Sequence, residues 1–266
     1  MLVLANGAFK SGSTWLFEIL SATERFSYVP YEYSRLPYPA RPWLAQSKIK
    51  PFLATGLHHK ENYLTKMHLF SERLRDTLLS YDDVFIFDIK RDIKDSLVSH
   101  YYHIIREGKF QEKYAKQEYI KDGFRKYYWR FGRYKAQQLV IYHKVWSIPS
   151  PKIYITSFEV LKNDFENEVS KITDFLGMPL TPVDIKKIRD KTTLSNLQKV
   201  RGQDKLEEHK RFFRKGVIGE WRQHFDSEML ADVERIEQQG LGTFDMLRYH
   251  AVFELIEVRK KLKKVL

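Results

Sequence analysis

The chain has 266 residues, of which 43% are hydrophobic and 15% aromatic, a composition typical of a folded globular chain and not of a disordered one. Its 46 Lys and Arg residues against 34 Asp and Glu give a formal net charge of +12, which favours an anionic partner such as a nucleic acid, an anionic membrane or a polyphosphorylated cofactor. The absence of cysteine excludes disulfides and thiolate metal sites.

No apolar stretch approaches the ~18 residues that a membrane span needs, so the sequence predicts no transmembrane segment. The apolar run at residues 2–5 is also shorter than the core of a signal peptide, which needs at least ~7 apolar residues. We therefore expect a cytoplasmic protein.

In chain order, the first expected element is a strand at residues 2–5, followed by a glycine loop and a helix that Ser13 or Thr14 caps. Residues 28–59 are rich in proline and tyrosine and predict an irregular excursion over one end of a sheet. Further strands are expected at 63–67, 84–87 and 153–155. The continuous apolar run at 84–87 is typical of a central strand covered on both faces.

Helices are expected at residues 69–79, 92–106, 115–147, 165–176, 182–190 and 226–238, with a C-terminal helix within 246–266. Strands separated by helices indicate the α/β class. The expected architecture is a P-loop-like parallel sheet flanked by helices, helix-rich, in a single domain that covers residues 1–266.

The segment from Gly7 to Thr14 has the glycine spacing of a P-loop, GxxxxGK[ST], but Ser13 stands where that motif has its lysine. The lysine of this segment is Lys10, inside the loop. Backbone amides and a helix N-terminus can still bind an oxyanion there, although an ordinary strand-to-helix turn explains the glycines equally well. Asp88 resembles a Walker B aspartate, but a buried strand that ends in a turn residue is the favoured interpretation.

Four segments together resemble the motifs of the PAPS-dependent sulfotransferases, where PAPS is 3′-phosphoadenosine 5′-phosphosulfate. Residues 10–15 (KSGSTW) resemble the KSGTTW loop for the 5′-phosphosulfate, and residues 66–69 (KMHL) resemble the KTHLP strand end with the catalytic histidine. Residues 91–102 (RDIKDSLVSHYY) resemble the 3′-phosphate segment RNPKDVAVSYYH, and residues 214–221 (RKGVIGEW) resemble RKGxxGDW. The segments occur in the family's order.

The resemblance implies transfer of a sulfuryl group from PAPS to an acceptor hydroxyl or amine, with release of 3′-phosphoadenosine 5′-phosphate (PAP). Lys10 would stabilise charge on the leaving phosphate, and His68 would be the general base in an in-line displacement. Lys66 would add positive charge beside the transferring group. No metal is implied, because a sulfuryl group carries less negative charge than a phosphoryl group, and the sequence shows no cluster of metal ligands.

The resemblance also implies which residues contact the cofactor. They are Ser11, Gly12, Ser13 and Thr14 at the 5′-phosphate, Trp15, Phe158 and Thr192 at the adenine, and Arg91, Ser99, Arg214, Lys215 and Gly216 at the 3′-phosphate. Phe158 stands where the family often has tyrosine and Leu194 replaces an aromatic residue, so looser adenine packing is implied. The simpler interpretations are a helix core residue for the tryptophan and a solvated basic loop for residues 205–215.

The acceptor is expected to be a small molecule or a glycan that contacts the excursions at residues 28–59 and 108–135. The candidate acceptor-side residues are Tyr28, Tyr31, Tyr33, Tyr38, Trp43, His58 and His59, although the aromatic ones suit packing equally well. Residues 121–135 interleave basic and aromatic side chains, which suits an anionic glycan or a single-stranded nucleic acid. An exposed amphipathic helix is the favoured interpretation.

Two other functions stay open at this point. One is a P-loop nucleotide kinase or NTPase, against which the position of Lys10 argues. The other is a non-catalytic nucleic-acid-binding protein that uses the +12 charge. Neither explains the four ordered segments, so a nucleic-acid partner is not expected. The C-terminal dimer motif of the animal cytosolic enzymes is not found, and the sequence predicts no oligomeric state.

Overall fold

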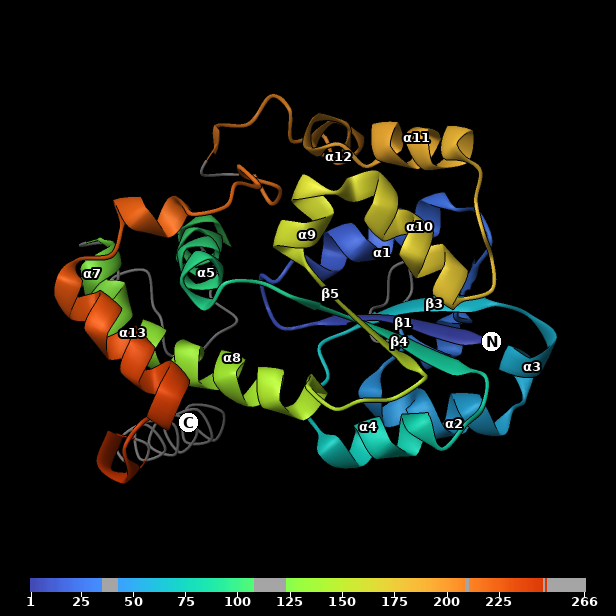
Figure 1. Cartoon of the computed structure of the whole chain (residues 1–266), viewed down its shortest axis with the longest axis horizontal. Coiled ribbons are helices and arrows are strands. Elements are labelled where there is room, and N and C mark those ends of the chain that lie inside the picture. The colour runs from blue at the N-terminus through green and yellow to red at the C-terminus, as the bar shows by residue number, and fades with distance from the viewer. Residues whose placement is uncertain (35–42, 108–122, 209–210, 246, 248–266) are drawn as a thin grey trace, which may run out of the picture. The chain divides into compact units, whose positions relative to one another are not determined.

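The computed structural model describes residues 1–34, 43–107, 123–208, 211–245 and 247 (Figure 1). The chain divides into two compact units, one of residues 1–92 and 142–204 and the other of residues 93–141 and 205–266. Each unit is described by itself. The C-terminal helix expected within 246–266 lies outside the described residues.

The first unit is built on a five-stranded sheet with the strand order β2-β3-β1-β4-β5. The strands are β1 (Leu2–Gly7), β2 (Ser27–Tyr28), β3 (Tyr63–Met67), β4 (Val84–Lys90) and β5 (Ile153–Ser157). Every pairing is parallel, so the carboxyl ends of β1, β3 and β4 meet at one edge of the sheet. The expected α/β class with a parallel sheet is confirmed.

Helices cover both faces of this sheet, with α1, α9 and α10 on one face and α2 and α4 on the other (Figure 1). The helices of the unit are α1 (Ser13–Ala22), α2 (Ile49–Ala54), α3 (Leu57–Lys60), α4 (Glu72–Leu79), α9 (Phe158–Asn163), α10 (Phe165–Phe175), α11 (Pro182–Lys191) and α12 (Leu194–Val200), with 3₁₀ turns η1 (Tyr31–Tyr33) and η2 (Gln46–Lys48). Because helices bury both faces, the central strand β1 is buried along its whole length.

The core of the first unit lies between the sheet and helices α1, α10 and α11. Val3 and Phe87 on neighbouring strands pack there with Ile19 of α1, Ile172 of α10 and Ile188 of α11. The apolar residues of the helices recur at helical spacing, which places one face of each helix on the sheet. This packing fixes α1, and therefore the loop that precedes it, against the carboxyl end of β1.

The second unit is helical in its described residues. It contains α5 (Ile93–Glu107), α7 (Phe124–Tyr127), a π-helical turn η3 (Tyr128–Gly132), most of α8 (Arg133–Trp146), a 3₁₀ turn η5 (Glu220–Gln223) and α13 (Ser227–Gln239). Arg133 donates from Nε to Asp232 on α13 at 2.7 Å, and the Tyr128 hydroxyl donates to the same carboxylate at 2.9 Å. These bonds attach α13 to the π-helical turn and the start of α8.

Several expected boundaries differ from the structure. Gly12, and neither Ser13 nor Thr14, is the N-cap of α1, and no side chain caps this helix. The helix expected from residue 69 begins later, because the Ser71 side chain accepts from the Leu74 N–H and so sets the start of α4. The proline-rich segment 28–59 contains short helices where an irregular excursion was expected.

Among the described residues, none of the helices is both long enough and apolar enough to cross a membrane.

Candidate functional site

The loop between β1 and α1 holds Lys10 in the left-handed region of backbone conformation. Its φ of 63° is uncommon for a residue with a Cβ atom. Both the N–H and the hydroxyl of Ser11 donate to the carbonyl of Ala8, at 3.3 and 2.9 Å, and so keep the turn closed. Strained conformations of this kind persist where the surroundings enforce them, and they cluster at ligand sites. The strained backbone makes this loop a candidate ligand site.

Two glycines allow this loop to lie close to its neighbours. A Cβ atom on Gly7 would lie 2.5 Å from Ser11 Oγ and 2.8 Å from Ile89 Cγ2, and both distances are too short for a contact. Gly12 has a φ of 101°, which favours glycine, and it precedes the first turn of α1. The first amides of a helix have no intrahelical acceptor and attract an oxyanion. The backbone of residues 11–14 therefore suits the phosphate-binding role expected of it.

His68 follows directly after β3, the neighbour of β1. Its Nδ1 lies 2.5 Å from the carbonyl oxygen of Gly7, so this nitrogen carries the proton and leaves Nε2 as the acceptor of the neutral ring. Lys66 Nζ lies 3.4 Å from Nε2 and 4.3 Å from the centre of the Trp43 ring. The structure thus brings the expected base and Lys66 together, beside the loop that carries Lys10.

Two buried hydrogen bonds fix the backbone that follows His68. The N–H of Leu69 donates to Asn6 Oδ1 at 3.1 Å, and the Leu69 carbonyl accepts from Trp146 Nε1 at 2.7 Å. Asn6 lies on β1, one residue before Gly7, so the two strand ends that carry the loop and the histidine are held by one side chain. Asn6 and Trp146 are positioning residues that the sequence did not predict.

Asp88 on β4 completes this network. The Tyr142 hydroxyl and Asn6 Nδ2 both donate to Asp88 Oδ1, at 2.5 and 3.2 Å, whereas Oδ2 is buried and accepts no hydrogen bond from the described residues. Burial raises the pKa of Asp88 to about 6, and the Tyr142 hydrogen bond opposes that rise. The side chain has no exposed surface. The resemblance to a Walker B aspartate therefore does not extend to an accessible metal-binding carboxylate.

The three residues expected at the adenine lie together in the first unit. Trp15 Nε1 donates to the Thr192 carbonyl at 3.1 Å, and the ring centres of Trp15 and Phe158 lie 5.5 Å apart. The Thr192 hydroxyl donates to the Ile188 carbonyl at 2.8 Å, so its oxygen is left to act as an acceptor. Phe158 is 7% exposed and belongs to the core. The core interpretation of Trp15 also holds, because its ring packs against that core.

Arg91, directly after β4, lies beside both the loop and this aromatic group. Its guanidinium lies 4.3 Å from the centre of the Phe158 ring, and Nη1 donates to the Lys10 carbonyl at 3.4 Å. The next residue is held too, since the Asp92 N–H donates to Glu159 Oε1 at 3.2 Å. The planar guanidinium stacks on the phenylalanine and is suited to bidentate contact with a phosphate.

The other residues expected at the 3′-phosphate lie in the second unit: the half-buried Ser99 on α5, and Arg214, Lys215 and Gly216 before η5. Arg214 donates to both carboxylate oxygens of Glu220, and Lys215 Nζ lies 3.2 Å from the same carboxylate. Burial opposes ionisation of Glu220, but the bonds from Arg214 and Lys215 outweigh it and lower its pKa. Because Arg91 belongs to the first unit, a shared phosphate site stays a prediction.

The candidate acceptor-side aromatics have different environments. The Tyr28 hydroxyl bonds Ser21 Oγ at 2.8 Å, and Tyr33 packs edge-on against Phe52, so both serve the packing of their own segments. Tyr38 lies outside the described residues. Trp43 packs against Lys66, two residues before the expected base, and it is the aromatic that this structure associates with the candidate site.

His58 and His59 do not lie on the acceptor side, and that expectation is wrong. They belong to α3, which precedes β3. Tyr63 at the start of β3 is in register with Leu2 at the start of β1, so α3 lies at the amino ends of the strands, opposite His68 (Figure 1). The segment before β3 must return the chain to this end, since the strands are parallel.

The basic and aromatic segment is packed in its described part, which begins at residue 123. Arg125 forms ion pairs with Asp226 and Glu228 at the start of α13, and Tyr127 and Phe131 are buried. The segment is helical from residue 124, with Phe124, Tyr127 and Phe131 on its buried face and Arg125 and Arg130 exposed, so the favoured amphipathic helix is confirmed in the described part. Residues 108–122 lie outside the described residues.

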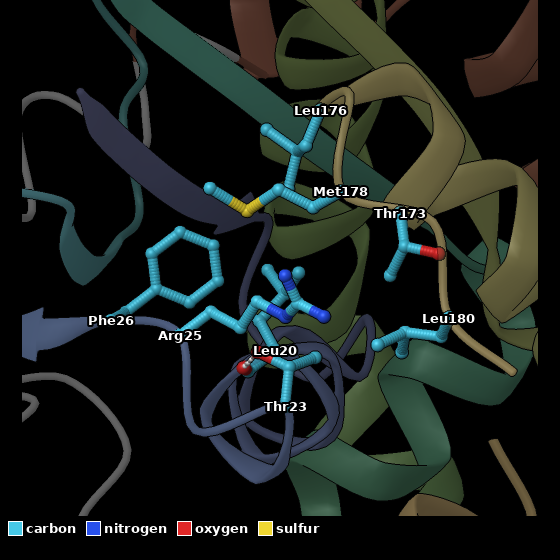
Figure 2. Close-up of a pocket in the computed structure, with 8 residues that line it drawn as sticks. All are labelled: Leu20, Thr23, Arg25, Phe26, Thr173, Leu176, Met178 and Leu180. Carbon is cyan, nitrogen blue, oxygen red and sulfur yellow. Dashed lines mark hydrogen bonds between the residues drawn. The ribbon is translucent and has the colours of Figure 1, made fainter. Parts of the chain in front are cut away.

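Figure 2 shows a hollow in the first unit, where the end of α1 faces the end of α10 and the residues after it. Leu20, Phe26, Leu176 and Leu180 form much of its lining. None of its eight lining residues is among the predicted site residues, and it is too narrow to hold a water molecule. The hollow is a packing defect of an apolar interface and not the candidate site.

The loop with Lys10, the lysine Lys66 and the hydrogen-bonded His68 thus meet at one edge of a parallel α/β sheet, an arrangement suited to an anionic substrate. The chain belongs to the sulfotransferase family, because the sequence model described as "Sulfotransferase domain" matches residues 3–245. The family expected from the four motifs is confirmed, and the chain is an enzyme of this class.

Relatives and solved structures agree with this assignment. The chain is 26% identical over 259 residues to flavonol 3-sulfotransferase of Flaveria bidentis, covering 88% of this chain and 79% of the relative. It is 24% identical over 246 residues to cytosolic sulfotransferase 3 of Arabidopsis thaliana, covering 88% and 75%. Its fold is similar to a mouse sulfotransferase complexed with PAP (TM-score 0.60, 18% identity, 93% and 88% covered) and to retinol dehydratase with androsterone and PAP (TM-score 0.60, 19% identity, 91% and 81% covered).

Proposed function

We propose that this protein transfers a sulfuryl group from PAPS to a hydroxyl or amine of an acceptor. The observation that carries the proposal is the geometry of His68. Its Nδ1–H donates to the Gly7 carbonyl, so Nε2 is the basic nitrogen, and the same glycine opens the loop that carries Lys10. PAPS supplies an activated sulfuryl group whose leaving group is PAP. The chain then has to remove one proton and stabilise one developing charge.

His68 removes the proton in this proposal. Nε2 accepts the proton of the acceptor hydroxyl or amine, while the Nδ1 bond to Gly7 keeps the ring from rotating. Lys66 Nζ, 3.4 Å from Nε2, adds positive charge at the place where the transferring group passes. Asn6 keeps the imidazole at this distance through its bond to the neighbouring Leu69 N–H.

Lys10 and the loop stabilise the leaving group in this proposal. The left-handed backbone of Lys10 fixes the direction in which its side chain leaves the loop. An ammonium held at a leaving phosphate stabilises the charge that develops there without reorganising during the reaction. Ser11, Gly12, Ser13 and Thr14 provide amide and hydroxyl donors for the 5′-phosphate at the start of α1.

The donor set also fits the rest of PAPS. Trp15, Phe158 and Thr192 form one aromatic and polar group that suits an adenine. Arg91 lies beside it and offers a forked donor for the 3′-phosphate. We assign Ser99, Arg214, Lys215 and the Gly216 amide to the same phosphate. Arg214 and Lys215 then share their charge between the phosphate and Glu220.

The names of the relatives and the position of Trp43 support proposals for the acceptor, the cell compartment and the domain organisation. Flavonol 3-sulfotransferase is named for a phenolic small molecule, and Trp43 beside Lys66 offers an aromatic wall next to the base. We therefore favour a small aromatic alcohol over a glycan. Relatives named cytosolic sulfotransferases support a cytoplasmic enzyme. We treat the chain as one sulfotransferase domain.

The test is transfer of ³⁵S from labelled PAPS to a panel of phenols, alcohols and amines. The wild type should sulfate at least one acceptor, and His68→Gln should lose that transfer while it still binds PAP. Lys50→Met, on an exposed face of α2, is the matched control for Lys10→Met. Full transfer by His68→Gln would remove the histidine from the mechanism.

A further inference from the structure

A second histidine cluster lies at the opposite edge of the sheet from His68. His58 and His59 are consecutive residues of α3, and Asp83 directly precedes β4. One ligand atom from each of these three side chains lies within 4.8 Å of the other two. The cluster shares no residue with the sulfuryl-transfer site.

The contacts inside the cluster are close but are not hydrogen bonds. His58 Nε2 lies 3.4 Å from Asp83 Oδ1, and His59 Nδ1 lies 2.7 Å from Asp83 Oδ2. Both carboxylate oxygens and both nitrogens of His58 are buried, and none of them has an aligned hydrogen-bond partner among the described residues. The Met1 ammonium attracts Asp83, but its hydrogen bonds go to the His58 and Glu61 carbonyls and to Asn62 Oδ1. The two buried carboxylate oxygens therefore still lack an aligned donor among the described residues, which is costly unless a directly bound cation compensates it.

Packing holds the imidazole of His58 in place. The side chain has no exposed surface and contacts the rings of Phe52 and Tyr81. The ring is therefore fixed beside Asp83, with Nε2 3.4 Å from Oδ1.

We propose that His58, His59 and Asp83 form a binding site for a divalent transition-metal ion of the zinc class. Two imidazoles and one carboxylate are a common protein ligand set for zinc, which leaves further positions for water. Zinc bonds of about 2.0–2.2 Å in tetrahedral geometry place neighbouring ligand atoms about 3.3 Å apart. The contact of 3.4 Å between His58 Nε2 and Asp83 Oδ1 matches this separation, whereas the contact of 2.7 Å between His59 Nδ1 and Asp83 Oδ2 is shorter, so His59 would have to move outward on binding the metal.

The site would join two segments that approach the same edge of the sheet. His58 and His59 precede β3, and Asp83 precedes β4, and both of these strands pair with β1. The Asp83 carbonyl also accepts from the Leu2 N–H at 2.8 Å, so the backbone beneath the ligand is already fixed. A metal there would stabilise the native sheet edge and take no part in the sulfuryl transfer, so the inference goes beyond the proposed function.

The test is zinc binding to the full chain, purified without a histidine tag and treated with a chelator. Isothermal titration with zinc sulfate should show one saturable site, and zinc should raise the temperature of unfolding. His59→Ala and Asp83→Asn should each weaken binding at least about tenfold and remove the thermal shift. His59 is 61% exposed, so its truncation is expected to leave the fold intact.

Two controls keep the test decisive. His103→Gln, on α5, removes a histidine outside the cluster and should leave the zinc affinity unchanged. Magnesium in place of zinc should bind far more weakly, because magnesium prefers oxygen ligands. The proposal would be overturned if the wild type had no saturable zinc site, or if His59→Ala and Asp83→Asn bound zinc as tightly as the wild type. It would also be overturned if the wild type bound magnesium as tightly as zinc.

Discussion

The two edges of the parallel sheet place histidines in opposite settings. At the carboxyl edge, His68 donates from Nδ1 to the Gly7 carbonyl and has a lysine beside Nε2. At the amino edge, His58 is fully buried beside the Asp83 carboxylate, whose oxygens accept no hydrogen bond from the described part of the chain. A ring with one nitrogen hydrogen-bonded by the backbone is arranged to exchange a proton at the other, whereas a buried ring beside a carboxylate suits the metal site that we propose. The neighbouring groups therefore determine whether a histidine of this sheet suits proton transfer or metal binding.

Substitutions at the carboxyl edge of the sheet are expected to have the largest effect on sulfuryl transfer. His68→Gln should lower kcat for sulfuryl transfer about 10²- to 10⁴-fold, because it removes a general base. Lys10→Met should lower it about 10²- to 10³-fold, because it removes a preorganised charge at the leaving group. Steady-state kinetics with labelled PAPS measures both. Lys50→Met should behave as the wild type, and near-full activity of either site variant would contradict the role of that residue.

A smaller effect is expected at Arg91, whose substitution should weaken cofactor binding and so distinguishes a phosphate contact from the general base. Arg91→Ala should weaken PAP binding about 10- to 100-fold, since a charge-assisted hydrogen bond contributes about 1.5–3 kcal/mol. Adenosine 5′-phosphate, which lacks the 3′-phosphate, should lose far less affinity. Calorimetry on both ligands measures the difference. Equal weakening would place Arg91 at another part of the nucleotide.

The buried network behind His68 predicts a pH-dependent stability. Because the pKa of Asp88 rises in the folded state from 3.8 to about 6, the folded chain holds a proton that the unfolded chain releases. The stability from this group is therefore present below about pH 4 and is lost as pH rises through about 6. The difference in unfolding free energy between wild type and Asp88→Asn should fall by at most about 3 kcal/mol between pH 4 and 7.

The comparison with Asp88→Asn is needed because the titration of His143 changes the unfolding free energy in the same pH range but in the opposite direction. Burial, and then the charge of Lys90, lower the pKa of His143 to about 4, so its contribution to stability is lost as pH falls below about 6.5. Urea unfolding of both proteins across this range isolates the aspartate. A difference that does not change with pH would show that Asp88 is ionised throughout.

The smallest effect is expected at the amino edge. His59→Ala should change kcat and KM for sulfuryl transfer less than about twofold, because His59 lies at the end of the strands opposite His68. The same assay with labelled PAPS, run with and without added zinc, measures it. A large loss of transfer in His59→Ala would show that the two edges are coupled and would contradict their independent roles.

The sequence predicted the sheet well because its strands are short buried apolar runs, and the β3 bounds, Tyr63–Met67, match the expected strand. His68 and Lys10 were proposed as site residues from motifs that are local in the chain, and the structure places both at the carboxyl ends of neighbouring strands. The sequence did not predict the bonds from Asn6 to Asp88 and Tyr142, which join residues 82 and 136 positions apart. A polar residue inside an otherwise apolar central strand was the available signal, since such a residue needs a buried partner.

The predictions for the cap of α1 and for the location of His58 and His59 were wrong for a different reason. Gly12 begins the helix because the tight approach to Phe158 and the left-handed backbone leave no room for a side chain. His58 and Asp83 meet because β3 and β4 both flank β1, and strand order cannot be deduced from the separate segments. Contacts that depend on topology therefore appear only with the fold.

The most direct test of the central claim is calorimetric binding of PAP to the chain, with ATP and Mg²⁺ as the control. The proposed site predicts micromolar or tighter binding of PAP and little binding of ATP, since Asp88 offers no exposed surface to a metal ion. Absence of PAP binding, or preferred binding of ATP with Mg²⁺, would contradict the assignment of the loop, Arg91 and the aromatic group to PAPS.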